Sequence, residues 1–344
     1  MNGRERIMNI FHRKEVDHAG FWIGMPHDET NEIYFPYFGV DNSLDLSYKL
    51  GSDMHVVMVH GESWKHPDGR RLFESMTAKE RKTLAEGGGL VDCETLSEVE
   101  AFPWPDPKYL NFIDNIAEVE RARAKGMAIF SGLWTPFFHD ICGLLGMENY
   151  FIKMHTHPEI VTAVTERVIE YYLEGNRMYF DEIGDRMDVF FFGNDLGSQL
   201  DLLISPEHYD TFVLPYKKKI IDLAKSRGYK VMLHSCGAVS RIIPKLIEAG
   251  VDALHPIQAK ANGMDADSLA KYANDLIFVG GVDTQEILPF GTTEQVKNEV
   301  RRIKSILGSG LIVSPSHETI LPNVSVENVL AMQEAAVERG ETCP

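Results

Sequence analysis

The sequence has 344 residues, with 34 Lys or Arg against 51 Asp or Glu, and its formal net charge is −17. An apolar fraction of 44% and a charged fraction of 25% are those of a folded globular chain, which excludes an intrinsically disordered or collagen-like protein. The acidic excess argues against nucleic acid and anionic membrane surfaces as partners, because both bind basic faces, and four scattered cysteines argue against a disulfide framework.

The first residues are charged and helical in pattern, and they lack the apolar core of a signal peptide. No run of about 18 apolar residues occurs, so we expect no membrane-spanning segment. The few cysteines fit a reducing compartment, and we therefore expect a cytoplasmic protein.

Apolar strand-like runs alternate with amphipathic helical segments along the chain. Several of these runs lack polar alternation, which is typical of strands buried on both faces of a parallel sheet. Helical patterns are clearest over 157–182, 239–249 and 292–307, and the Ser-Pro pair at 205–206 is typical of a helix N-cap. The predicted strands cover residues 19–23, 54–59, 127–131, 188–192, 229–233, 252–255, 277–280 and 311–314.

Eight strands with helices between them predict an α/β protein of the (β/α)8 TIM barrel type, and a doubly wound open sheet is the alternative. We expect a single barrel domain over residues 1–344. The segment 61–110 fits the alternation poorly, and we interpret it as a hairpin-like insertion after the second strand.

Polar groups follow every predicted strand, where a barrel of this kind carries its functional residues. The histidines His60, His139 and His255 are interpreted as hydrogen-bonded rim residues. Aromatic residues at 134, 137 and 138 could line the pocket of a flat ligand or could pack in the core. The carboxylate at 283 could face a ligand or cap a helix at 284–288. The candidate substrate-binding residues at these strand ends are His27, Trp134, Asn194, Gln199, Gln258 and Asp283.

HisSerCysGly at 234–237 carries the most specific chemistry of the strand ends. Residues two apart in a strand point the same way, so His234 and Cys236 can present a nitrogen and a sulfur to one ion. Zinc favours such a mixed set, and a catalytic zinc site needs a third ligand and an open position. The alternative is a hydrogen-bonded histidine beside a buried cysteine.

Asp195 and His317 complete the candidate catalytic residues. Asp195 lies in a Gly-rich stretch after the fourth strand, where it could be a ligand, a base or only a turn residue. His317 lies between two prolines after the eighth strand, where it could join the site or cap the C-terminal helix at about 325–338.

Several of these stretches resemble the uroporphyrinogen decarboxylase superfamily. They include the residues from HisSerCysGly to Asp252, GlyGlyValAsp at 280–283, and SerProSerHis at 314–317 followed by GluAsnVal. AspLeuGlySerGln at 195–199, followed by IleSerProGluHisTyr and LeuProTyr, resembles it too. The resemblance covers nearly the whole chain and implies the same (β/α)8 barrel.

The superfamily has a metal-free decarboxylase branch and a cobalamin-dependent methyltransferase branch. The decarboxylases carry an arginine-rich stretch after the first strand, where this chain has GlyMetProHisAspGlu at 24–29. Binding a polycarboxylate without those arginines would be electrostatically unfavourable for a chain of net charge −17. The decarboxylases also have Ser where this chain has Asp195, whereas His317 matches their histidine in the last loop.

The methyltransferase branch carries the His-x-Cys pair that His234 and Cys236 match. Its third ligand lies in the last loop and is Cys in the coenzyme M methylases, whereas this loop offers no Cys. The metal role is therefore carried onto His317, with Asp195 or Glu318 as alternatives. This departure puts coenzyme M as the acceptor in doubt.

The resemblance implies a zinc-dependent methyltransferase that moves a methyl group between a small substrate and the corrinoid of a partner protein. The small molecule would be a methoxylated aromatic, or a thiol or folate acceptor. The alternative is a metal-free decarboxylase of a smaller carboxylated substrate, with His317 and Asp195 as proton donors. A non-catalytic corrinoid-binding barrel is a third hypothesis.

Overall fold

Eight parallel strands form one continuous sheet in a computed structural model of the chain, which describes residues 1–74, 83 and 86–338. Their order is β1-β8-β7-β6-β5-β4-β3-β2, so the sheet follows the chain and returns β8 to the side of β1. The predicted (β/α)8 barrel is confirmed, because a doubly wound sheet would reverse this order. The strands are β1 (Gly20–Phe21), β2 (Met54–Val59), β3 (Ala128–Leu133), β4 (Val189–Gly193), β5 (Lys230–His234), β6 (Ala253–Ile257), β7 (Ile277–Val282) and β8 (Leu311–Pro315).

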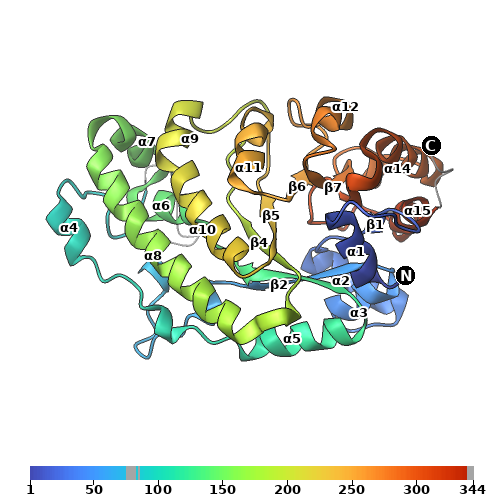
Figure 1. The fold of residues 1–344 in the computed structure, drawn as a ribbon, viewed down its shortest axis with the longest axis horizontal. Helices are drawn as coiled ribbons and strands as arrows, with labels where there is room; N and C mark the ends of the chain where they lie inside the picture. The colour runs from blue at the N-terminus through green and yellow to red at the C-terminus, as the bar shows by residue number, and fades with distance from the viewer. Residues whose placement is uncertain (75–82, 84–85, 339–344) are drawn as a thin grey trace.

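The helices surround the strands, and the N-terminus lies on the same side as α14 and α15, the last two helices (Figure 1). The helical segments predicted at 157–182 and 292–307 are α8 and α14, and the Ser205 side chain caps α9 by accepting a hydrogen bond from the backbone of His208. In the described ranges no helix combines the length and apolarity needed to cross a bilayer. The helices are α1 (Gly3–Phe11), α2 (Asp28–Phe38), α3 (Ser43–Lys49), α4 (Leu96–Ala101), α5 (Ile113–Ala124), α6 (Phe137–Leu145), α7 (Met147–Thr156), α8 (Pro158–Ile183), α9 (Pro206–Phe212), α10 (Leu214–Ser226), α11 (Ile243–Ala249), α12 (Ala266–Leu269), α13 (Ile287–Phe290), α14 (Thr293–Leu307) and α15 (Val326–Val337).

Several strands extend one or two residues beyond their predicted ends. His234 is the last residue of β5, and His255 lies inside β6, where its side chain is fully buried. The interpretation of His255 as a rim residue is therefore wrong. A run of apolar residues reveals only the part of a strand that has apolar side chains. The backbone hydrogen bonds to the neighbouring strand continue through the polar residues that follow.

Asp53 and the neighbouring Ser52 link β1 to the start of β2, and Oγ of Ser52 accepts from the N–H of Ile23 at 3.0 Å. The described residues contain no strand ladder between these two elements. Instead, the backbone N–H of Asp53 donates to the carbonyl of Phe21 at 2.8 Å, and the Asp53 carboxylate accepts from the N–H of Phe21 at 2.9 Å. The buried Arg6 guanidinium pairs with the same carboxylate. A side chain therefore bridges the gap beside the two-residue strand β1.

Apolar side chains fill the barrel interior. Phe130, Phe191, Met232 and Ile312 belong to a buried cluster that seven of the eight strands contribute to, together with α1 and Trp22. The barrel is therefore a packed core and not a pore, and a ligand can reach the strands only at an open end.

The segment 61–110 starts and ends with an antiparallel bridge between Trp64 and Leu110. The indole of Trp64 donates to the carbonyl of Asp106 at 2.7 Å, which ties the two ends together. Residues 75–82 and 84–85 of this segment lie outside the described residues. Its assignment as a hairpin-like insertion in a single domain stays a prediction.

Lys217 on α10 provides a stability prediction. It is fully buried, its Nζ has no hydrogen-bond partner in the described chain, and this nitrogen lies 5.5 Å from the centroid of the Tyr209 ring. Burial lowers the pKa of Lys217 to about 7. Because the folded-state pKa lies below the unfolded one, the unfolded chain binds this proton more tightly, and stability falls as the pH drops from 10.5 towards 7.

We expect Lys217→Met to stabilise the protein more at about pH 7 than at about pH 10, by roughly 2–4 kcal/mol. Denaturant unfolding at the two pH values measures the difference. Lys218→Met is the matched control, since the exposed Lys218 on the same helix pairs with Asp222, and its effect should be small at both pH values. An equal gain at both pH values for Lys217→Met would contradict the prediction.

Candidate metal centre

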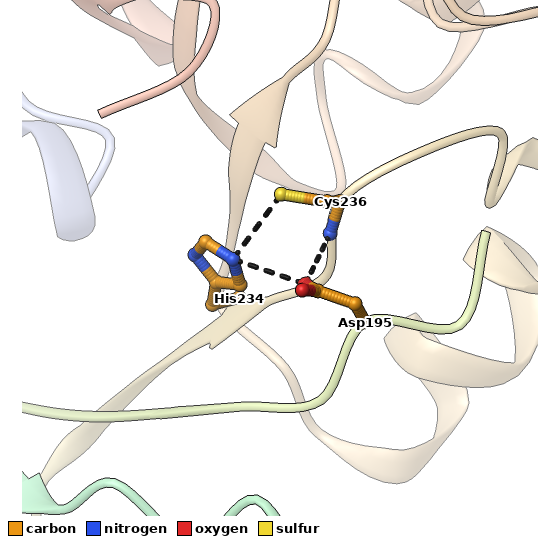
Figure 2. A group of neighbouring side chains, drawn as sticks. All are labelled: Asp195, His234 and Cys236. Carbon is orange, nitrogen blue, oxygen red and sulfur yellow. Dashed lines mark hydrogen bonds and ion pairs between the residues drawn. The ribbon is translucent and has the colours of Figure 1, made fainter. Parts of the chain in front are cut away.

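Three side chains converge at the carboxyl ends of β4 and β5. The Nε2 atom of His234 lies 3.1 Å from Oδ1 of Asp195 and 3.4 Å from Sγ of Cys236 (Figure 2). One ligand atom from each of the three residues lies within 4.8 Å of the other two. The His-x-Cys pair predicted from the sequence therefore presents its nitrogen and sulfur to one point, and Asp195 adds an oxygen.

Backbone contacts hold the loop that carries Cys236. The backbone N–H of Cys236 donates to Oδ1 of Asp195 at 2.9 Å, and the N–H of Gly237 donates to Oε1 of Gln258 at 2.6 Å. Gly237 has a φ of +84°, and a Cβ at this position would lie 2.2 Å from the carbonyl oxygen of Gly197. The loop therefore needs glycine at 237 for two reasons, its left-handed backbone and the close approach of the loop after β4.

Burial and neighbouring charges shift the pKa values of all three side chains. Burial opposes ionisation of Asp195, but the hydrogen bond and charge of His234 and the N–H of Cys236 hold the pKa of Asp195 well below its usual range. Burial, followed by the nearby charges of Asp195 and Glu318, raises the pKa of the Cys236 thiol. Burial lowers the pKa of His234, but hydrogen bonding to Asp195 and the charges of Glu318 and Asp195 outweigh it and raise that pKa.

Two further groups lie behind His234. Its Nδ1 atom lies 3.0 Å from Nδ1 of His255, and Nε2 of His255 lies 4.0 Å from Oε2 of Glu318. His234, His255 and Glu318 form a second set whose ligand atoms lie within 4.8 Å of one another. The Nε2 of His255 and Oε2 of Glu318 are buried without a hydrogen-bond partner in the described ranges.

These residues fit a divalent cation. A soft sulfur, two imidazoles and two carboxylates are the donors that zinc accepts, and a zinc ion favours deprotonation of a coordinating thiol. Without a positive charge, Cys236 faces two carboxylates, which raise its pKa, and Glu318 leaves a buried oxygen unsatisfied. A cation at this point would reverse both effects.

Aromatic rings surround the candidate centre. The ring centroid of Trp134 lies 5.1 Å from that of His234, and the ring centroid of Phe191 lies 5.6 Å from that of His255. Trp22 lies 5.2 Å from His255 on another side. The imidazoles are therefore enclosed by apolar faces, which strengthens electrostatic interactions at the site.

A comparison with models of known protein families identifies the family of the chain. The model of the family described as uroporphyrinogen decarboxylase (URO-D) matches residues 93–339. The chain belongs to the URO-D family. The resemblance inferred from the motifs is thereby confirmed.

Curated relatives of this URO-D family member include two methyltransferases of Methanosarcina species. The methylated-thiol–coenzyme M methyltransferase of Methanosarcina mazei is 26% identical over 216 residues, which are 59% of this chain and 53% of that protein. Methylcobamide:CoM methyltransferase MtbA of Methanosarcina acetivorans is 29% identical over 219 residues, which are 64% of this chain and 61% of that protein. The chain therefore matches little more than half of the length of these relatives.

A solved structure agrees over the full length. A methyltransferase from Methanosarcina mazei has a TM-score of 0.66 with this URO-D family member, at 17% sequence identity, and the match covers 98% of both chains. At this identity the likeness establishes a shared barrel fold.

The structure does not bring His317 into either ligand set of this URO-D family member. Its Nδ1 accepts a hydrogen bond from the backbone of Thr319 at 3.2 Å, and its side chain is 38% exposed. The neighbouring residue Glu318 is the one whose carboxylate points to the buried histidines. The residue of the last loop that joins a possible ligand set is therefore Glu318, one of the alternatives to His317, and its Oε2 also lies 3.7 Å from Nδ1 of His317. A ligand role for either residue stays a prediction.

The predicted substrate-binding residues are dispersed. His27 is exposed and caps α2, and Gln199 is exposed on the loop after β4. Asn194 Oδ1 accepts a hydrogen bond from the backbone N–H of Phe138, and its Nδ2 donates to the carbonyl of Thr135. The Asp283 carboxylate accepts from the backbone N–H groups of residues 285–287. Asn194 and Asp283 therefore hold loops, which for Asp283 is the capping alternative.

Two predicted residues do lie beside the centre. Trp134 packs on His234, and Gln258 holds the Cys236 loop through Gly237. The pocket role considered for Phe137 and Phe138 is wrong, because both are fully buried on α6.

Proposed function

We propose that the chain is a zinc-dependent methyltransferase that exchanges a methyl group with the corrinoid of a partner protein. The observation that supports this proposal most strongly is the convergence of His234 Nε2, Cys236 Sγ and Asp195 Oδ1 on one point at the open end of the barrel. Membership of the URO-D family supports the same reaction class, as do the names of the curated relatives, which describe methyltransferases that act with coenzyme M.

His234, Cys236 and Asp195 would hold the zinc ion, with Glu318 close enough to compete for a position. When bound, zinc would supply Lewis acidity to the sulfur or oxygen of the small substrate.

The residues of the chain prepare the site for this chemistry. Asp195 accepts a hydrogen bond from the backbone N–H of Cys236, and its Oδ1 lies 3.1 Å from Nε2 of His234, so one carboxylate lies beside both other donors. Gln258 fixes Gly237, which prevents the Cys236 loop from moving away from the strand. Trp134 and Phe191 exclude water from the imidazole side of the centre, while Asp195 and Cys236 remain partly exposed towards the mouth.

The half-exposed side of Trp134 provides a flat apolar wall beside the donors. A corrin ring has such a flat face, so we propose that the corrinoid protein docks over this end of the barrel. The small substrate would be a thiol or folate acceptor, or a methoxylated aromatic donor.

A metal and methyl-transfer assay tests the proposal. We expect about one zinc per chain by elemental analysis. With methylcobalamin as the probe, consumption of the methyl-cobalt absorbance in the presence of a thiol panel that includes coenzyme M measures transfer to an acceptor. Reduced cobalamin with a methoxylated benzoate measures the opposite direction.

Removal of the metal by a chelator should abolish transfer, and added zinc should restore it. Protein that contains no zinc and transfers no methyl group in either direction would contradict the proposal. Such a result would favour the metal-free decarboxylase.

A further inference from the structure

His255 lies directly behind the candidate ligand His234. The two residues are register partners in the ladder between β5 and β6, and their Nδ1 atoms lie 3.0 Å apart. His255 is fully buried, and rings of Trp22 and Phe191 enclose it at 5.2 and 5.6 Å. Its imidazole is therefore held in one orientation, with one nitrogen towards His234 and the other away from it.

The hydrogen-bond geometry assigns a proton to each imidazole. A metal at Nε2 of His234 requires that nitrogen to be unprotonated, so the proton of the neutral ring lies on Nδ1. That Nδ1–H then donates to Nδ1 of His255, which leaves the proton of His255 on Nε2. The Nε2 of His255, which would then carry the proton, lies 4.0 Å from Oε2 of Glu318, and neither atom has a hydrogen-bond partner in the described part of the chain. Nδ1 of His317 lies 3.7 Å from the same oxygen.

We propose that His255 is a positioning residue for the metal ligand His234, and that Glu318 orients His255 in turn. The proposal rests on the proposed function, because it needs a metal at Nε2 of His234. Glu318, His255 and His234 then form a continuous line of polar contacts from the loop after β8, through β6, to the end of β5.

This line has a defined chemical effect. A histidine whose second nitrogen donates a hydrogen bond is locked in one tautomer and is a stronger ligand. An isolated imidazole divides its population between two tautomers and several ring orientations, and only some of these place a lone pair at the site. Loss of the acceptor at His255 therefore weakens metal binding without removing a ligand.

Zinc affinity of the purified full chain, measured by competition with a chromophoric chelator, tests the proposal. We expect His255→Leu, which keeps a similar volume but removes the acceptor, to weaken zinc binding by about 10–100-fold. His255→Asn places an amide oxygen near the former Nδ1 position, so we expect it to restore most of the affinity. Absorption of the cobalt-substituted protein should keep the thiolate charge-transfer band of Cys236 in every variant and change its ligand-field bands only in His255→Leu.

His55→Leu is the matched control. His55 is also a buried strand histidine, and its Nε2 lies 2.7 Å from a carboxylate oxygen of Glu118, but it stands at the amino end of β2. Its replacement should cost stability and leave zinc affinity within about twofold. Thermal unfolding of each variant separates loss of fold from loss of ligand orientation.

Three results would contradict the proposal or a part of it. Equal zinc affinities for His255→Leu and the wild type would overturn the positioning role while leaving the proposed function intact. Wild-type protein that binds neither zinc nor cobalt would overturn the proposed metal centre and the positioning role together. If Glu318→Ala abolished zinc binding, Glu318 would be a ligand itself, and its assignment behind His255 would be wrong.

Discussion

Replacement of His234 by alanine is expected to abolish methyl transfer and to weaken zinc binding by more than about 100-fold, which exceeds the loss caused by changes behind a ligand. His234 is the only residue common to both ligand sets found among the described residues. Its removal leaves Asp195 and Cys236 facing each other, and the negative carboxylate disfavours the thiolate that zinc requires. Elemental analysis and chelator competition measure the loss.

The control for this prediction is His55→Ala, which also deletes a buried, hydrogen-bonded strand histidine. We expect this variant to lose stability but to retain its zinc and its activity. A His234→Ala protein that is folded and transfers methyl groups at the wild-type rate would refute the assignment of the centre.

Gly237→Ala is expected to cause the largest loss of stability among the glycine substitutions at this end of the barrel. The new Cβ would lie 2.2 Å from the carbonyl oxygen of Gly197, and both partners are backbone, so no side chain can move aside. Gly228 has the same φ of +84° with nothing within 4 Å, which makes Gly228→Ala a control for backbone strain alone.

For Gly228→Ala we expect a cost of about 1–2 kcal/mol in the free energy of unfolding. Gly237→Ala should cost roughly 1–3 kcal/mol more, because the loop must also be displaced. Since displacement separates Cys236 from Asp195, zinc affinity should fall only in Gly237→Ala. Denaturant unfolding and zinc titration measure the two effects. Equal losses of unfolding free energy in the two variants would contradict the close contact between the loops of Gly197 and Gly237.

The number and approximate positions of the strands were predictable from local patterns, whereas their order was not, since a doubly wound sheet was the alternative. Continuous apolar runs such as those at 54–59 and 188–192 report burial on both faces, and helical periodicity between them reports crossover connections. These signals depend only on neighbours along the chain. They lose accuracy at strand ends, which is why His255 was predicted as the last residue of a strand, at the rim, whereas β6 continues to Ile257.

The His-x-Cys pair was equally local, because the two-residue repeat of a strand aligns His234 with Cys236 in any extended segment. The other members of the site were not local. Gly193 and His255 are both register partners of His234, and this register brings Asp195 to one nitrogen of His234 and His255 to the other. Nothing in the spacing of those residues along the chain encodes that register.

The sequence by itself therefore indicated eight strands that alternate with helices, favoured the barrel through the family resemblance, and placed the candidate His-x-Cys pair at the end of one strand. Only the tertiary structure brought Glu318 and not His317 into a possible ligand set, showed that Asp283 accepts hydrogen bonds from a turn, and placed Nδ1 of His255 3.0 Å from Nδ1 of His234. The physical reason is that side-chain periodicity is a property of one element. The direction of a loop side chain, and the contact between two histidines on neighbouring strands, depend on how separate strands are aligned and packed.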